Sequence, residues 1–410
     1  MPEPELLCPA GSPEKLYTAL CYGADAVYMG VPGLNLRAQS SGFPDLFRIK
    51  EAVAFTRKQG KKAYLCLNIL AREKNLDPAK HCLEEMGKIA PDGLIIADPG
   101  LLDMALRICP HIPVHLSTQA NASNSAALHF WESAGVRRVN LAREMGLRDI
   151  RRCAENCGEL ELEVFVHGAM CMAVSGRCLM SAYLNKRSAN LGLCTHPCRF
   201  DYRACLLLEE KKRPGQTTWT VEEDENFSRI LASEDLCLIK YLSWLTKKEI
   251  HALKIEGRMK SIAYLAQVTD AYKTALRDLS RTNFRPHLYL EELKKTATRP
   301  LGSGFFLPRP KIFARPDSVE SRGVLARITG QGSADSWPIQ AKARWGEGTE
   351  AELLLPGLLR PSLGADTYRL EDENGRRVKT AHPGMNIFLR SGHPDLREGI
   401  ILRKRHPEAK

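Results

Sequence analysis

The sequence predicts an α/β protein, namely a TIM-like (β/α)8 barrel followed by a small C-terminal all-β barrel domain. Two observations lead to this prediction. Through residues 1–280, short apolar runs alternate with amphipathic segments, which is the pattern of repeated βα units. From about residue 319, the runs become short and alternating with Gly and Pro between them, which is typical of a small β-barrel or sandwich.

Eight apolar runs are the predicted barrel strands. They are Glu5–Leu7, Ala26–Met29, Lys62–Asn68, Gly93–Ala97, Val114–Ser117, Arg138–Leu141, Leu162–Val166 and Ala252–Glu256. Eight units in about 260 residues match the usual size of a TIM barrel. An open doubly wound sheet is the alternative, but no Gly-x-Gly-x-x-Gly turn follows the first run.

Several helices between these strands have recognisable ends. Ser12 and Pro13 suit the N-cap and the first position of a helix that ends near Gly23. Gly60 is suited to end a helix over Phe47–Lys58. Further helices are predicted over Asn124–Ser133, Arg148–Glu155 and Ser261–Leu279, the last of which closes the barrel wall.

Three segments lie outside the strand–helix rhythm of the barrel. Residues about 203–232 are charged and polar, which predicts a surface insertion. Residues 281–318 are rich in Pro, Arg and aromatic side chains, which predicts a linker that crosses the barrel surface. Residues 319–405 form the predicted β domain, with strands over Gly323–Ile328, Ile339–Arg344, Glu350–Leu355, Ala381–Phe388 and Gly399–Leu402.

The composition is that of an ordinary globular protein. Of the 410 residues, 44% are apolar and 26% are charged. The net charge of +11 favours a polyanionic partner, although an excess of this size is also typical of charge that only maintains solubility. The basic runs Arg376–Lys379 and Arg403–Arg405 are open to the same two interpretations, contact with RNA phosphates or a solvated surface.

The sequence predicts a cytoplasmic protein without membrane contact. No apolar stretch approaches the roughly 18–20 residues of a membrane span. The N-terminus has neither the basic start nor the apolar core of a signal peptide. In such a chain, thirteen cysteines indicate free or metal-bound thiols rather than a disulfide framework.

The cysteine-rich stretch 163–202 is where we expect the chemistry. Six residues separate Cys171 from Cys178, three separate Cys194 from Cys198, and Cys237 follows later. Structural zinc sites usually have two short pairs of cysteines, and this stretch has one. An iron–sulfur cluster accepts irregular spacing, because it collects thiolates from several loops. Metal binding is therefore the hypothesis, and inert buried cysteines are the alternative.

Polar residues follow the predicted strands repeatedly. In a TIM barrel the active site lies at these strand ends, so we expect a ring of polar side chains around one pocket. The residues at these strand ends are Cys8, Tyr28, Gly30, Asn68, Asp98, Gln119, Asn121, Arg143, Glu144, His167, Glu256, Arg258 and Lys260. Arginine binds carboxylates and phosphates with two parallel hydrogen bonds, which makes Arg143, Arg177 and Arg258 candidate clamps, with Arg37 as another. For any single residue, a hydrogen bond or loop cap is the alternative.

Longer motifs resemble those of a known family. His167-Gly168-Ala169-Met170-Cys171, followed by Ser175-Gly176-Arg177-Cys178, is similar to the signature of the collagenase-like peptidase family, peptidase family U32. The similarity extends over most of residues 1–280 and implies a barrel-like fold. It includes Glu5–Gly11, Gly23–Tyr28, Asn185–Arg187, Cys194, Cys198-Arg199 and Leu253–Arg258.

The resemblance has implications for function, because several members of this family are RNA- or quinone-hydroxylation proteins. The nearest type in layout, which has an extra C-terminal domain, makes 5-hydroxyuridine at the wobble position of tRNA with prephenate. The resemblance implies a 4Fe–4S cluster on Cys171, Cys178, Cys194 and Cys237, with Cys198 as substitute ligand. The tRNA type can carry Arg where this chain has Cys237, a departure that favours a four-cysteine cluster here.

The preferred prediction is an iron–sulfur enzyme that hydroxylates tRNA wobble uridine, with tRNA as partner and prephenate or a similar dicarboxylate as co-substrate. Its candidate catalytic residues are His167, Glu256 and Arg258, with a structural role as the alternative for His167. Its candidate substrate-binding residues are Arg37, Asn68, Gln119, Arg143, Arg177 and Lys260.

Three alternative functions stay open. A peptidase is one, although neither a Gly-x-Ser-x-Gly nor a His-Glu-x-x-His motif is present. Oxygen-independent hydroxylation of ribosomal RNA or of a quinone is another. The third is a cluster-bearing partner of another protein without catalysis of its own.

Overall fold

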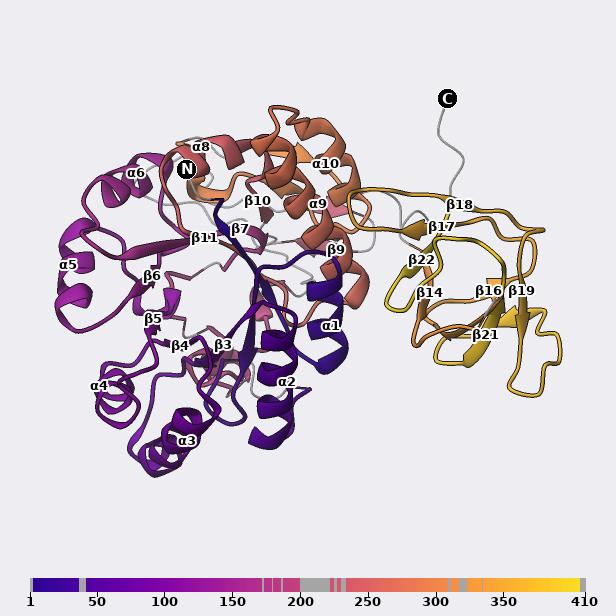
Figure 1. Cartoon of the computed structure of the whole chain (residues 1–410). Helices are drawn as coiled ribbons and strands as arrows, with labels where there is room; N and C mark the ends of the chain where they lie inside the picture. The colour runs from indigo at the N-terminus through magenta and orange to yellow at the C-terminus, as the bar shows by residue number, and fades with distance from the viewer. Residues whose placement is uncertain are drawn as a thin grey trace.

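The computed structural model describes residues 3–36, 42–171, 173–178, 180–185, 187–199, 222–224, 227–229, 234–308, 311–316, 323–333 and 335–405. Arg37 and most of the predicted insertion at 203–232 lie outside these ranges. The chain forms a larger α/β domain and a smaller β domain that lie side by side (Figure 1).

Eight parallel strands form a closed barrel. In order around the ring they are β1 (Glu5–Pro9), β2 (Ala26–Gly30), β3 (Lys62–Leu67), β4 (Gly93–Ile96), β5 (Val114–Leu116), β6 (Arg138–Asn140), β7 (Glu161–Ala169) and β11 (Ala252–Ile255). The ring closes because β11 pairs in parallel with both β7 and β1. Every strand coincides with one of the eight apolar runs, so the predicted (β/α)8 barrel is confirmed.

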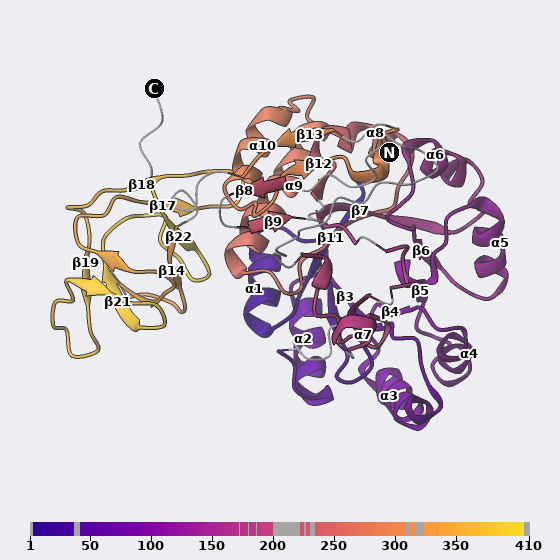
Figure 2. The ribbon, with the colours of Figure 1, turned by 180° about the vertical axis from the view of Figure 1, so that it is seen from behind.

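Helices cover the outside of the barrel (Figures 1 and 2). Ser12 caps the first of them by accepting a hydrogen bond from the Lys15 backbone N–H at 3.3 Å, with Pro13 at the first helical position. The helices are α1 (Pro13–Cys21), α2 (Leu46–Lys58), α3 (Leu76–Ile89), α4 (Pro99–Ile108), α5 (Ser125–Ser133), α6 (Leu147–Glu155), α8 (Leu242–Lys247) and α9 (Ile262–Ser280). Among the residues described, none of these helices has the length and apolarity to cross a membrane.

Between β7 and β11 the chain makes a long excursion. It contains the short helix α7 (Met180–Asn185), a hairpin of β8 (Glu222–Asp224) and β9 (Phe227–Arg229), and the strand β10 (Asp235–Cys237). The β10 strand pairs antiparallel with the end of β7. This excursion carries the cysteine-rich stretch to the barrel mouth, on the side of the molecule seen in Figure 2.

In the segment expected to be a linker, 281–318, the described residues contain regular structure that extends the barrel. It contains α10 (Pro286–Lys294), β12 (Leu301–Gly302) and β13 (Ile312–Ala314), and β12 pairs with β10. Pro286 opens the helix, because proline tolerates the first helical turn. Leu290 and Leu293 are buried in the main apolar core, which holds the helix in place.

The barrel interior has an apolar half and an ionic half. Leu7, Tyr28, Tyr64, Cys66 and Ile95 lie together in the apolar half. The ionic half is built on β5, β6, β7 and β11, whose buried polar residues include His115, Arg138, Glu163 and Lys254. Since buried charges are stable only when they are paired, each charge of this half depends on its ionic partner.

The histidine of the ionic half is neutral. Burial lowers the pKa of His115 well below its usual value, and the nearby charges of Arg138 and Lys254 lower it further. The neutral ring packs edge-on against Tyr64, with ring centres 4.6 Å apart. A protonated ring would add a third cation beside Arg138 and Lys254, so the neutral form keeps the charges of this half balanced.

The C-terminal domain is a seven-stranded antiparallel sheet around its own apolar core. Its strand order is β18 (Ser362–Leu363), β17 (Ala351–Leu354), β22 (Ile401–Lys404), β14 (Val324–Ile328), β15 (Ser336–Ala341), β21 (Asn386–Arg390) and β19 (Arg369–Glu371). A small pair, β16 (Trp345–Gly346) and β20 (Thr380–Ala381), completes it. The all-β prediction is confirmed, but within the described part of the chain no pairing joins β18 to β19, so hydrogen bonds do not close this sheet into a barrel.

A buried ionic network joins the two domains. Glu292 of α10 lies 3.0 Å from both Arg360 and Arg403 of the β domain, and Asp270 of α9 lies 2.9 Å from Arg360. Burial alone raises the pKa of Glu292, but the two guanidiniums outweigh burial and lower this pKa to about 2. Arg403 is 1% exposed, so it is a structural residue of the interface and not part of an RNA-binding surface.

Apolar contacts extend this interface along α9. Tyr22, Ile262 and Ala266 of the barrel pack against Leu354 and Ile401 of the β domain. The Tyr22 hydroxyl donates to the Leu354 carbonyl at 2.7 Å and accepts from the Ile401 N–H at 3.3 Å. The predicted helix at 261–279 is confirmed as α9, and it is buried nearly all round because it lies between the barrel and the second domain.

We predict that Glu292→Gln lowers the free energy of unfolding by about 3 kcal/mol. The substitution leaves two buried guanidiniums with one carboxylate each, Asp270 for Arg360 and Glu352 for Arg403. Glu291→Gln is the matched control, because Glu291 is exposed and, among the described residues, pairs with Lys294 on the helix surface, where such pairs contribute about 0.3–0.5 kcal/mol. Urea unfolding of the full chain measures both values, and equal losses for the two variants would contradict the prediction.

Candidate functional site

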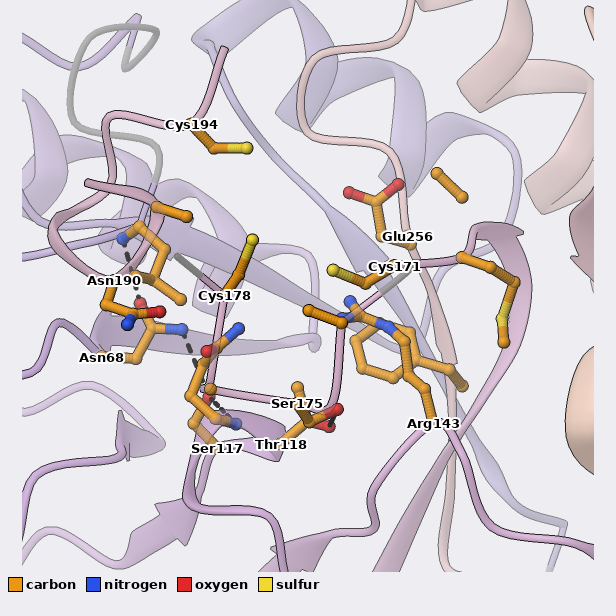
Figure 3. A pocket seen from close by; sticks show the side chains of 18 of the residues that line it. Asn68, Ser117, Thr118, Arg143, Cys171, Ser175, Cys178, Asn190, Cys194 and Glu256 are labelled. Carbon is orange, nitrogen blue, oxygen red and sulfur yellow. Dashed lines mark hydrogen bonds between the residues drawn. The ribbon is translucent and has the colours of Figure 1, made fainter. Parts of the chain in front are cut away.

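A cavity of about 240 Å³ opens at the carboxyl ends of the barrel strands (Figure 3). Side chains from several strands form its floor, among them Tyr28, Cys66, Ile95, Phe165 and Lys254. The volume is just below the usual range of ligand pockets, about 300–1,000 Å³. The cavity therefore suits a small metabolite or a single nucleobase.

The cysteine loop after β7 is held against the ends of β5 and β6. The Glu144 carboxylate accepts hydrogen bonds from the Ser175 backbone N–H at 3.0 Å and from the Ser175 hydroxyl at 2.9 Å. The Asn121 side-chain amide donates to the same carboxylate at 2.5 Å. Gly176 has φ +77°, and a Cβ there would lie 2.0 Å from the Gln119 carbonyl oxygen. Only glycine allows this approach, so the loop is tightly fixed.

Four cysteines line this cavity: Cys171, Cys178, Cys194 and Cys198. The thiols of the first three point into it in Figure 3. The Cys194 sulfur accepts a hydrogen bond from the His196 backbone N–H at 3.4 Å. None of the cysteines in the described ranges forms a disulfide. The donor chemistry of the cavity is therefore that of a soft metal site.

The fifth candidate, Cys237, is placed differently. It lies on β10 opposite His167 of β7, is fully buried, and is not among the residues that line the cavity. Burial raises the pKa of its thiol to about 11. The structure thus gathers four of the five candidate ligands around one cavity, while the fifth is buried and does not line it.

The residues present fit a cluster better than a single metal ion. Within the described ranges, no three His, Cys, Asp or Glu side chains lie close enough together to hold one ion. A 4Fe–4S cluster carries its thiolates on separate iron atoms, so it needs thiols distributed around a space. Four thiols around one cavity meet that requirement.

Three cations lie over two aromatic rings in the cavity. The Lys254 Nζ is 4.6 Å from the Tyr28 ring centre and 5.5 Å from the Phe165 ring centre. The Arg258 guanidinium carbon lies 5.8 Å from the Tyr28 ring centre, and that of Arg143 lies 4.0 Å from the Phe165 ring centre. This arrangement stabilises the cations in a partly dry site and provides anion-binding groups there.

Amide groups complete the lining. The Asn68 side chain donates to the Ser117 hydroxyl at 3.3 Å and accepts from the Leu36 N–H at 3.2 Å (Figure 3). Gln119 and Asn140 also line the cavity, and the buried Asn140 Oδ1 has no hydrogen-bond partner among the described residues. Amides donate and accept, so they suit the polar edge of a base or a carbonyl-bearing acid.

Several residues predicted from the sequence line this cavity: Asn68, Gln119, Arg143, Glu256, Arg258 and the four cysteines. Arg177 is exposed, and Lys260 lies outside the lining, where its ammonium is 3.5 Å from the Asp235 carboxylate. Arg37 lies outside the described residues. Lys254, Asn140 and Phe165 also line the cavity without having been predicted as site residues. A signal for Lys254 was available, because a lysine in an otherwise apolar strand is unusual.

His167 is buried and does not line the cavity. Burial lowers the pKa of its imidazole to about 3, with a further contribution from the Lys260 charge. The ring is therefore neutral at physiological pH and contacts the Tyr272 hydroxyl at 3.4 Å. This placement favours the structural alternative over proton transfer.

Comparison with known proteins connects this site to a family. Residues 11–314 match Peptidase family U32. The chain is 35% identical to tRNA hydroxylation protein P of Escherichia coli (strain K12) over 397 residues, with 86% of each chain covered. It is 39% identical over 311 residues to tRNA hydroxylation protein P1 of Bacillus subtilis (strain 168), with 75% of this chain and 72% of the relative covered.

Two further matches have lower sequence identity. The chain is 31% identical over 304 residues to the 23S rRNA 5-hydroxycytidine synthase of Escherichia coli (strain K12), with 72% of this chain and 44% of the relative covered. Among solved structures, the U32 peptidase Mk0906 matches 62% of this chain and 93% of its own, at 12% identity and a TM-score of 0.40. The strand pairing described above, and not this likeness, establishes the barrel.

We predict that Gly176→Ala detaches the cysteine loop from the barrel, because the added Cβ would overlap the Gln119 carbonyl. The thiols of Cys171 and Cys178 should then react several-fold faster with a thiol reagent in metal-free protein. Gly375→Ala is the matched control, since Gly375 has a similar φ of +74° but no atom within 4 Å of the place that an added Cβ would take. Unchanged thiol reactivity in Gly176→Ala would contradict this account of the loop.

Proposed function

The chain belongs to peptidase family U32, and from this premise we propose that it is an RNA-modifying enzyme that hydroxylates the wobble uridine of tRNA to 5-hydroxyuridine, with prephenate as co-substrate and a 4Fe–4S cluster as cofactor. The observation that carries the proposal is the cavity, which combines four thiols with three cations and two aromatic rings at the barrel mouth. The names of the relatives supply the substrate class.

The cations of the cavity are suited to a small organic acid. Arg258 is held by a hydrogen bond of 3.1 Å to the Asn35 side-chain oxygen, which fixes its guanidinium against Tyr28. A Cβ on Gly30 would lie 2.6 Å from that guanidinium, so glycine makes room for it. Arg143 is fixed over Phe165 on another strand. Two ordered guanidiniums can each bind a carboxylate with two hydrogen bonds.

The polar rim is suited to a base taken out of its stack. Enzymes that modify a base recognise it by hydrogen bonds to its edge and by stacking on apolar or aromatic side chains. Asn68 and Gln119 supply such hydrogen-bonding groups, and the cavity has room for one base rather than a helix. The net charge of +11 supports binding of the tRNA backbone, which would then weaken steeply with salt.

Cys171, Cys178, Cys194 and Cys198 are the residues that would hold the cluster. Cys198 is favoured over Cys237 as the fourth ligand, because it lines the same cavity while Cys237 is buried on β10. A bound cluster would supply electron transfer or ligation of a substrate oxygen. The chain itself contributes the fixed loop, which Glu144 and Gly176 hold over the cavity.

We predict that the chain restores 5-hydroxyuridine to the tRNA of a host that lacks its own tRNA hydroxylation proteins, as measured by mass spectrometry of digested tRNA. Arg258→Ala should lower the product at least about tenfold, because a lost charged hydrogen bond of about 1.5–3 kcal/mol weakens binding by that factor or more. Arg107→Ala is the matched control, since Arg107 is exposed on α4.

Other results of this experiment would redirect the proposal. An increase of 5-hydroxycytidine in ribosomal RNA without any 5-hydroxyuridine in tRNA would indicate a different RNA substrate. Hydrolysis of a gelatin or casein substrate by the purified protein, lost in Arg258→Ala and accompanied by no RNA product, would indicate a peptidase.

We predict that protein purified without oxygen has the broad visible absorption of an iron–sulfur cluster, with matching iron and sulfide content. The Cys198→Ser variant should lose this absorption and the Cys237→Ser variant should keep it, because of these two cysteines only Cys198 lines the cavity. The reverse result would assign the fourth ligand to Cys237. A colourless, iron-free, folded wild-type protein would refute the cluster.

A further inference from the structure

We propose that Lys254 anchors one carboxylate of a small dicarboxylate at the floor of the cavity, and that Glu163 is its positioning residue. The inference rests on the proposed function only in taking a small organic acid as a ligand. It concerns the part of the cavity to which the β11 strand contributes its one charged side chain.

Lys254 is a buried ammonium that reaches the cavity. The residue is 4% exposed, lies between the fully buried Leu253 and Ile255, and lines the cavity. Its Nζ donates to a Glu163 carboxylate oxygen at 2.7 Å. An ammonium has three donors, and among the described residues this carboxylate is its one hydrogen-bond acceptor. The faces of the Tyr28 and Phe165 rings attract the cation but are weaker partners than an oxygen.

Lys254 is the last member of a row of alternating charges inside the barrel. Arg138 lies 2.7 Å from the Glu5 carboxylate and 2.6 Å from that of Glu161. The same guanidinium lies 3.8 Å from the second carboxylate oxygen of Glu163, whose first oxygen binds Lys254. Each charge fixes the next, so the position of the Lys254 ammonium depends on the whole row. Lys254 is the member that meets the cavity.

Packing alone does not account for this row. Beside the row, the same interior contains an apolar cluster that includes Leu7, Cys66 and Ile95 together with Tyr28 and Tyr64. Replacement of buried ion pairs by apolar residues is often neutral or stabilising, so an apolar floor is available to this fold. Asn140 lines the same cavity, and its buried Oδ1 has no hydrogen-bond partner among the described residues. Two polar groups with unused hydrogen-bonding capacity at one cavity point to a ligand.

The positions of the rings indicate what kind of ligand. Lys254 shares the Tyr28 ring with Arg258 and the Phe165 ring with Arg143. A ligand with two carboxylates can therefore place one at the ammonium and the other at a guanidinium fork. A compact ammonium makes a point contact, while the planar forks bind bidentately, so the two ends are not equivalent. An uncharged nucleobase does not require the ammonium.

The test compares the binding of two acids by calorimetry. Prephenate has two carboxylates, and phenylpyruvate has one together with a similar ring. In a Lys254→Met/Glu163→Gln double variant, we expect prephenate to bind about 10- to 100-fold more weakly and phenylpyruvate to change less than about threefold. The double variant is used because Lys254→Met alone leaves a buried carboxylate without its partner. Lys254→Arg should retain most of the prephenate affinity, and Lys88→Met, an exposed change on α3, should retain all of it.

Each other outcome overturns the anchor. Unchanged prephenate affinity in the double variant would contradict the proposed role of Lys254. An equal loss of affinity for both acids would also contradict it, because that result would indicate a collapsed cavity. Failure of the wild-type protein to bind either acid would contradict it as well. The proposed function is decided separately by the tRNA product in cells. Selective loss of prephenate binding without any 5-hydroxyuridine in tRNA would uphold the anchor and refute the function.

Discussion

The parallel pairing of β7 with β11 is the constraint on which the rest of the site depends. It joins residues far apart in the sequence, as in the Glu163–Lys254 ion pair, whose members are 91 positions apart. The upper end of β7 also pairs with β10. Gly168 permits the close approach of β7 to the turn after β11, because a Cβ there would lie 2.5 Å from the Glu256 carbonyl oxygen. The cysteine loop leaves β7 and the Glu256–Arg258 turn leaves β11, so this one pairing places thiols and guanidinium on the same cavity.

The barrel was predictable from the sequence because its signals are local. The apolar runs match all eight strands, and caps such as Ser12 and Ser261 act within three residues of themselves. The contacts that decide which cysteines lie around the cavity are not local. Nothing in the spacing of Cys194, Cys198 and Cys237 indicates that the first two line a cavity while the third is buried outside its lining.

The charge of a side chain was the least reliable guide to whether that side chain is buried, exposed or part of the cavity. Arg403 stands in a basic run that resembles a solvated surface, yet its partners Glu292 and Glu352 come from two different domains. Arg177 lies in the conspicuous cysteine motif but is exposed, while Lys254 is hidden in an apolar strand and reaches the cavity. In each case, the tertiary partners decide whether a charged side chain is structural, solvated or available to a ligand, and those partners are remote in sequence.

The helix α9 connects the cavity to the second domain. Its N-cap, Ser261, follows Arg258 by three residues, and Tyr264 in its first turn donates to the Glu256 carbonyl at 2.8 Å. Further along the same helix, Gln267 and Asp270 bind Arg403 and Arg360 of the β domain. One rigid helix thus sets both the rim of the cavity and the position of the domain.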